Sequence, residues 1–181
     1  MKIKRKSYMK IIFSILVFIH TLYAHPHTFI EVYPTITVKD KTVEKIHFIW
    51  KLDEMTSSML IMEFDQNGNN KIDDNEKEFI YQNYFSSLLD YNFYTDITTK
   101  DTIEKFPIPN KFDAFIENNK LCYSFEIDKK LNINDSLFDF GDKDFFIAMI
   151  LKKEFVTING AQALVSDLDN DFYFGYRLEI K

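Results

Sequence analysis

The chain has 181 residues, of which 46% are hydrophobic, and a formal net charge of −6 at neutral pH. This length is enough for one compact domain. The acidic balance argues against nucleic acid and anionic membrane surfaces as partners. The single cysteine, Cys122, excludes an internal disulfide, and it lies within an apolar stretch typical of a buried strand.

Residues 1–24 have the pattern of a signal peptide. A basic leader precedes an apolar run at 11–19 that is short for a membrane span, and Ala24 supplies the small residue that a signal peptidase requires. An uncleaved N-terminal anchor is the alternative. Cleavage would remove five positive charges, change the net charge to −11, and leave 25–181 as a single periplasmic domain without a membrane anchor.

The first part of that domain predicts an antiparallel hairpin. Apolar residues alternate with polar ones at 27–38 and again at 43–52, as in strands with one buried face. If the buried faces match, Val32 pairs with Trp50 and Ile36 with Ile46. His47 then lies opposite Thr35.

A helical region and a series of short strands follow. Asp53 is the expected N-cap of a helix that ends near Phe64, and a second helix is expected at 74–89. Beyond Tyr91, alternating segments between turn residues predict strands at 92–99, 111–117, 121–128, 135–140, 144–151, 154–158 and 171–180. We therefore expect an α+β fold, a mostly antiparallel β domain with an EF-hand-like helix–loop–helix inserted at about 53–90.

The segment 65–76 has the spacing of a calcium-binding EF-hand loop. Its expected ligands are side-chain oxygens and one backbone carbonyl, in the order Asp65, Asn67, Asn69, Lys71 (carbonyl), Asp73 and Glu76. Ile72 occupies the position that normally turns an apolar side chain inward.

Two departures distinguish this loop from a strong calcium site. Asn70 replaces the usual glycine, although asparagine tolerates the left-handed conformation better than most residues. Only three ligands are carboxylates, so we expect a dissociation constant on the order of 10⁻⁴ to 10⁻³ M. The alternative is a polar, asparagine-rich turn without calcium.

A second candidate metal site lies at the predicted mature N-terminus. Cleavage after Ala24 would give His25 a free α-amine beside its imidazole, and His27 adds a second imidazole. Such nitrogens suit nickel, copper, zinc or cobalt. The hairpin register places Asp53 and Glu54 near this terminus as co-ligands and leaves His47 roughly 26 Å away. The alternative is a frayed terminus with two solvated histidines.

Three methionines, Met55, Met59 and Met62, recur at helical spacing in the first helix. A soft-metal site for Cu(I) is one interpretation, because thioethers favour that ion. An apolar face packed into the core is the interpretation that we prefer, because methionine commonly fills gaps in cores.

Several segments together resemble a known family. They are the His-Pro-His stretch at 25–27, the Trp-Lys-Leu-Asp-Glu-Met-Thr-Ser-Ser stretch at 50–58, the loop at 64–72 and the strand at 121–125. The chain resembles a bacterial family of periplasmic proteins of unknown function, labelled as a component of an uncharacterised ABC-type transport system. The resemblance covers nearly all of 25–158. Members are often associated with nickel/cobalt permeases, which implies transition-metal handling outside the inner membrane.

The sequence leads to three hypotheses for the function of the protein. The first is a periplasmic accessory protein that presents a transition metal to an inner-membrane permease or ABC transporter, with calcium stabilising the loop. The second is a calcium-stabilised scaffold or binding module with no transition-metal role. An enzyme is the least favoured, because the sequence contains no recognisable nucleophile context and no phosphate-binding glycine loop.

Overall fold

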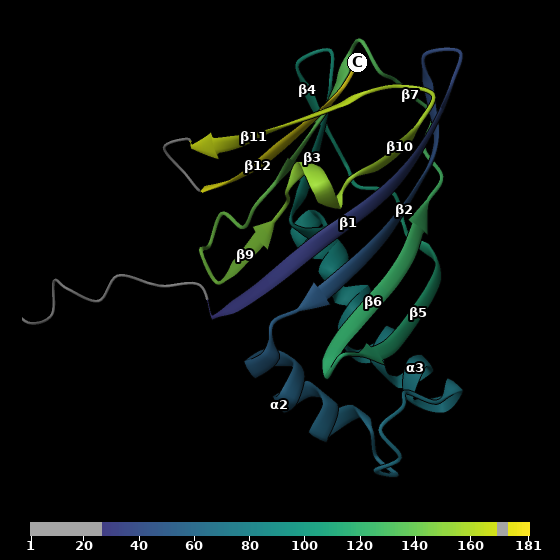
Figure 1. Cartoon of the computed structure of the whole chain (residues 1–181), viewed down its shortest axis with the longest axis vertical. Helices are drawn as coiled ribbons and strands as arrows, with labels where there is room; N and C mark the ends of the chain where they lie inside the picture. The colour runs from purple at the N-terminus through teal and green to yellow at the C-terminus, as the bar shows by residue number, and fades with distance from the viewer. Residues whose placement is uncertain (1–26, 170–173) are drawn as a thin grey trace, which may run out of the picture.

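The computed structural model describes residues 27–169 and 174–181, and these residues form two β-sheets with a helical segment at one end (Figure 1). The larger sheet has the strand order β10 (Thr157–Asn159), β1 (Thr28–Lys39), β2 (Thr42–Leu52), β6 (Lys120–Ile127) and β5 (Asn110–Glu117). Two short strands complete it: β9 (Ile147–Ile150) also pairs with β1, and β7 (Leu131–Asn132) also pairs with β2. The smaller sheet has the order β11 (Ala163–Asp169), β12 (Phe174–Ile180), β8 (Ser136–Phe140), β3 (Thr95–Thr99) and β4 (Thr102–Glu104). Described pairings are antiparallel except those of β1 with β9 and β10.

The hairpin β1–β2 has the predicted register. Val32 pairs with Trp50, Ile36 with Ile46, and Thr35 with His47. Because side chains alternate between the two faces of a strand, matching the apolar residues of two strands leaves one register that buries them all. The register prediction is therefore confirmed.

The core lies where the two sheets face each other. Phe48 on β2 packs against Phe125 on β6 within the larger sheet, with ring centroids 5.3 Å apart. It also meets Phe140 on β8 of the smaller sheet, at 6.4 Å. These rings and Trp50 are almost fully buried. Large aromatic side chains of this kind contribute much of the apolar area that stabilises a domain.

The predicted α+β class with an inserted EF-hand-like helix–loop–helix is wrong. The described residues are mostly β and contain one main α-helix, α2 (Glu54–Phe64), whose bounds agree with the expected first helix. The second, α3 (Asp74–Ile80), has seven residues. It passes into a π-helical turn at Tyr81–Phe85 and 3-10 turns at Ser86–Tyr94. The expected regular helix at 74–89 therefore ends at Ile80.

Aromatic packing accounts for this departure from the α-helix. The π turn widens the helix by one residue, and within it Phe85 packs at ring distances of 4.3 Å from Phe112 and 5.1 Å from Phe125. These contacts with the larger sheet favour a widened turn over regular α geometry.

The preferred interpretation of the three methionines is also wrong. Met55, Met59 and Met62 are 62%, 54% and 80% exposed, so they do not form a core face. The buried residues of α2 are instead Thr56, Ser57 and Phe64. In contrast, Cys122 is fully buried as expected, and burial raises the pKa of its thiol.

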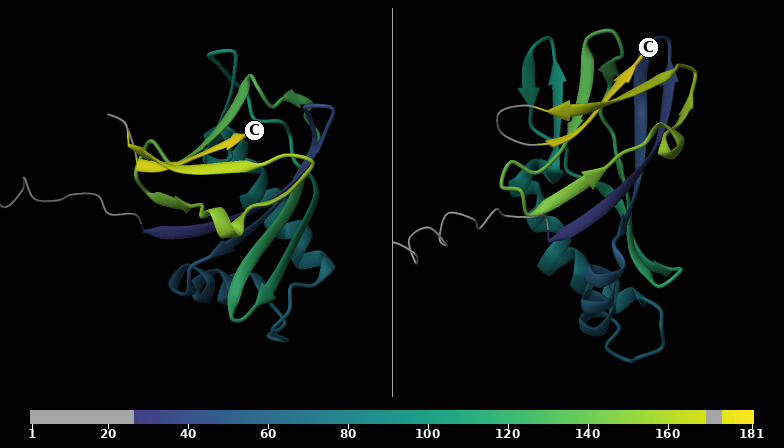
Figure 2. Two further views of the ribbon diagram at one scale, coloured as in Figure 1. Left: turned by 45° about the horizontal axis from the view of Figure 1, so that its top comes forward. Right: turned by 60° about the vertical axis from the view of Figure 1, so that its left-hand side comes forward.

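Two further views show α2 and the loop that follows it at one end of the molecule, away from the C-terminal hairpin β11–β12 (Figure 2). In the described part of the chain, we find no helix that is long and apolar enough to cross a membrane.

Candidate functional site

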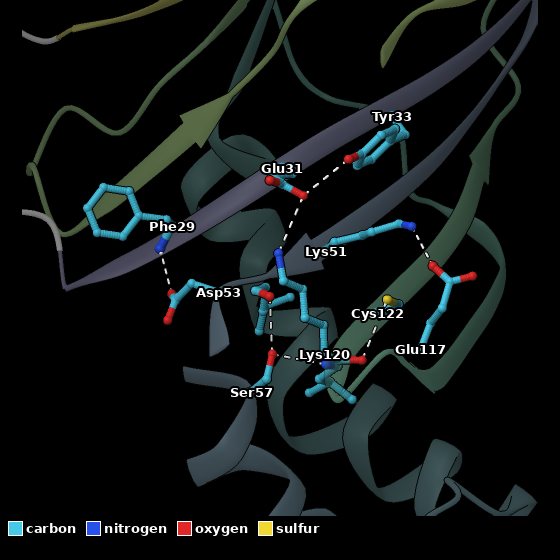
Figure 3. A network of polar contacts seen from close by, with 11 residues as sticks. Phe29, Glu31, Tyr33, Lys51, Asp53, Ser57, Glu117, Lys120 and Cys122 are labelled. Atoms are coloured by element: carbon cyan, nitrogen blue, oxygen red, sulfur yellow. Dashed lines mark hydrogen bonds and ion pairs between the residues drawn. The ribbon is translucent and has the colours of Figure 1, made fainter. Parts of the chain in front are cut away.

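The start of β1 is joined to the start of α2 through Asp53 (Figure 3). One Asp53 carboxylate oxygen accepts from the backbone N–H of Thr56 at 2.9 Å, which caps the helix. The other accepts from the Phe29 N–H at 2.9 Å and from the Thr56 hydroxyl at 2.8 Å. The Asp53 N–H in turn donates to the Phe29 carbonyl at 2.9 Å. The register argument, which placed the beginning of the first strand beside Asp53, is thus confirmed.

These hydrogen bonds set the charge state of Asp53. Burial alone would raise the pKa of its carboxyl group, but the hydrogen bonds from Phe29 and Thr56 outweigh burial and lower the pKa below its ordinary value. Asp53 is therefore a carboxylate at neutral pH. Its two oxygens already accept hydrogen bonds, and these hold the beginning of β1 against the start of α2.

His27 lies close to this junction and is exposed. Its backbone N–H donates to the Phe146 carbonyl at 2.9 Å, and its ring stacks on that of Phe146 with centroids 6.4 Å apart. Glu54 is exposed in the first turn of α2. His25, the other predicted nitrogen ligand, lies outside the described residues. Within residues 27–169 and 174–181, no three His, Cys, Asp or Glu side chains form a metal-binding group.

His47 stays apart from the chain start, as the register predicts. Its Nε2 lies 2.8 Å from the Ser124 hydroxyl on the neighbouring strand β6, and the ring is half-buried. Its cross-strand partner is Thr35, eight positions along β1 from His27. His47 therefore lies far along the hairpin from His27 and does not share a site with it.

Side chains of the loop at 65–76 form hydrogen bonds with one another and with the loop backbone. Asn67 and Asn69 both donate through their side-chain amides to one oxygen of Asp73, at 2.8 and 2.9 Å. The Asn69 N–H donates to Asp65 and to the Asn67 side-chain oxygen, both at 3.0 Å. The Lys71 N–H donates to the Asn69 side-chain oxygen at 2.8 Å.

Glu76 closes this loop and is almost fully buried. Its two oxygens accept from the backbone N–H groups of Gln66 and Asp73, each at 2.8 Å. Asn70 has φ +59°, the left-handed conformation anticipated for the position that usually carries glycine, and Ile72 is buried as expected. Among the described residues, Asp65, Asp73 and Glu76 do not form a metal-binding group, and the oxygens of Asp65 and Glu76 accept hydrogen bonds from the loop backbone.

Two parts of this region were not singled out from the sequence. Ser57 is buried and links three elements. Its hydroxyl donates to the Leu52 carbonyl at 3.1 Å and accepts from the Leu121 N–H at 2.9 Å (Figure 3). On the outer face of the larger sheet, Glu31 pairs with Lys120 at 3.7 Å, and Lys51 pairs with Glu117. A serine one turn inside a helix gives no signal of such links, because its partners are set by the tertiary fold.

The fold and the candidate sites thus define a mostly β protein of two facing sheets, with one main helix that joins the chain start to an oxygen-rich loop. Residues 10–166 match the family described as "Protein of unknown function (DUF1007)", and the chain belongs to this family.

Two relatives are also uncharacterised. The chain is 29% identical over 97 residues to the "Uncharacterized 15.5 kDa protein in trpE 3'region" of Spirochaeta aurantia, an alignment that covers 52% of this chain and 69% of that protein. It is 25% identical over 135 residues to an "Uncharacterized protein" of Haemophilus influenzae, covering 70% of this chain and 62% of that protein.

Proposed function

We propose that the protein is a periplasmic metal-binding accessory factor that presents a transition metal of the nickel or cobalt type to an inner-membrane permease or ABC transporter. The observation that supports the proposal is the attachment of the beginning of β1, at Phe29, to Asp53. This contact holds the first described residues against α2 instead of leaving them as a frayed end.

The metal in this proposal binds at the chain start. A processed His25 would supply an amine and an imidazole, and His27 a second imidazole, which are ligands that nickel, cobalt, copper and zinc accept. Glu54, an exposed carboxylate in the first turn of α2, would be a further ligand. Asp53 fixes the direction of the strand. An exposed site of this kind suits transfer to a partner, because an ion that is released must remain accessible.

Calcium has a separate, structural role in the proposal. The loop at 65–76 follows directly after α2, and the N-cap of α2, Asp53, bonds the beginning of β1. Calcium on Asp65, Asn67, Asn69, Asp73, Glu76 and the Lys71 carbonyl would stabilise this connection. The alternative function is a calcium-stabilised scaffold or binding module without a transition metal.

A native mass spectrum of the full chain, exported to a periplasm and supplied with nickel and calcium, tests the proposal. The expected mass begins at His25 and includes one calcium and one nickel ion. The nickel should be lost in the H25A variant while the calcium remains. H47A is a matched control that should retain both ions, because its ring lies far along the hairpin.

Two outcomes would contradict the transition-metal role. A mass that retains residues 1–24 would remove the free amine, and a mass with calcium alone would leave the scaffold as the better account. Loss of nickel from H47A as well as H25A would place the nickel elsewhere than the chain start.

A further inference from the structure

The exposed methionines on α2 form a second cluster of metal-ligating side chains. Met55, Met59 and Met62 are all more than half exposed, although methionine is usually a buried residue. The packing of the helix does not require them, since other residues of α2 contact the core. Figure 1 shows α2 at the end of the molecule opposite β11 and β12.

Helix geometry places these three side chains in one stripe. Positions i, i+4 and i+7 fall within an arc of about 60° on a helix of 3.6 residues per turn, and they span about 10 Å along its axis. Neighbours at these spacings have Cβ atoms about 5–6 Å apart. Met59 has both of the others as such neighbours, and methionine has three rotatable side-chain bonds, so the sulfurs of Met55 and Met62 can turn toward an ion beside Met59.

The charges on α2 favour a cation. The helix contains no lysine or arginine, and its charged residues are Glu54 and Glu63. Thioether sulfur is neutral and soft, and it binds Cu(I) in preference to hard ions such as calcium or magnesium. We propose that Met55, Met59 and Met62 form a Cu(I)-binding site on the surface of α2.

This site is chemically distinct from the proposed nitrogen site at the chain start. Sulfur ligands select Cu(I), whereas imidazole and amine ligands suit nickel, cobalt, zinc and Cu(II). It does not require removal of the leader or a free terminal amine. The two sites can therefore be tested independently.

The test is a titration of the full chain, labelled with ¹³C at the methionine methyl groups, with Cu(I) kept reduced by ascorbate without oxygen. The methyl signals are assigned by single Met→Leu variants. We expect the signals of Met55, Met59 and Met62 to shift together and to saturate with one ion. Met149 is 2% exposed in the core and serves as the internal control, with no shift expected.

Variants and a competing chelator complete the experiment. Leucine has nearly the volume and helix propensity of methionine, so M55L/M59L/M62L should fold normally and lose the ion to the chromogenic chelator bicinchoninate. M149L and H27A should retain the ion. The proposal is overturned if none of the three signals shifts, or if the triple variant, verified as folded by circular dichroism, keeps its Cu(I).

Discussion

At the scale of single residues, Asp53 connects the first strand to the first helix. Its carboxylate satisfies one of the free N–H groups at the start of α2 and one N–H of β1. Both hydrogen bonds need the side-chain oxygens of Asp53 as acceptors. Asp53 therefore contributes to local stability whether or not a metal is bound.

The D53A substitution should destabilise the protein by about 0.5–2 kcal/mol, the usual loss for an N-cap, with a further contribution from the unpaired Phe29 N–H. Urea denaturation monitored by tryptophan fluorescence measures the change. An unchanged midpoint would show that Asp53 does not hold the two elements together.

The stabilisation by Asp53 should depend on pH. Because the folded-state pKa of Asp53 is lowered, its contribution is complete above the ordinary aspartate pKa, near 4, and is lost as the pH falls through the lowered value. The difference in unfolding free energy between wild type and D53A should therefore shrink below about pH 4. D53N, which can still cap the helix, is the control that lacks this titration.

At the scale of secondary-structure elements, Ser57 attaches α2 to the larger sheet. Its hydroxyl bonds the end of β2 and the beginning of β6, and all three groups are buried. Removing a hydroxyl from such a place leaves a donor and an acceptor without partners. The free-energy penalty for such unpaired buried groups usually exceeds the contribution of an exposed hydrogen bond to stability.

S57A should therefore destabilise the protein by about 1–3 kcal/mol. S58A is a matched control, since Ser58 is exposed and its hydroxyl bonds only the Glu54 carbonyl within the same helix. Chemical denaturation of the two variants compares them directly. Equal losses in S57A and S58A would argue against Ser57 as the link between helix and sheet.

The sequence predicts these elements where the signal is local or periodic. The hairpin register followed from alternating residues, and the ligand spacing of the 65–76 loop lies within twelve residues of chain. The exposed face of α2 was missed because Thr56 and Ser57, rather than apolar residues, make its buried contacts. Strand β11 was missed because none of its residues is fully buried, although Ala163 and Val165 pack against the core. His27 contacts Phe146, a partner so distant in sequence that no local pattern indicates it.

At the scale of the whole molecule, the loop at 65–76 is the place where ligand binding would alter global stability. A ligand that binds only the folded state stabilises it by mass action. For millimolar calcium and a dissociation constant of 10⁻⁴ to 10⁻³ M, this amounts to about 0.4–1.4 kcal/mol. The effect is a modest rise in melting temperature rather than a switch between folds.

Calcium chelation should therefore lower the melting temperature of the wild type by a few degrees, as measured by calorimetry. E76Q retains the shape of Glu76 and an acceptor for one backbone N–H but lacks the charge, so it should lose most of this response. If wild type and E76Q responded alike, the loop would be a polar turn without calcium.

The position of β1 in the larger sheet has a consequence for the order in which the molecule assembles. β1 pairs with β2 directly, but its parallel partners β9 and β10 begin about 120 residues later in the chain. A polypeptide that emerges N-terminus first can form the hairpin early. One edge of β1 then stays unpaired, and open to other chains, until most of the polypeptide has been delivered. The sheet is thus completed late, by strands far from β1 in the sequence, and such non-local pairing favours slow folding. Until then, β1 is a strand that a holding chaperone could protect.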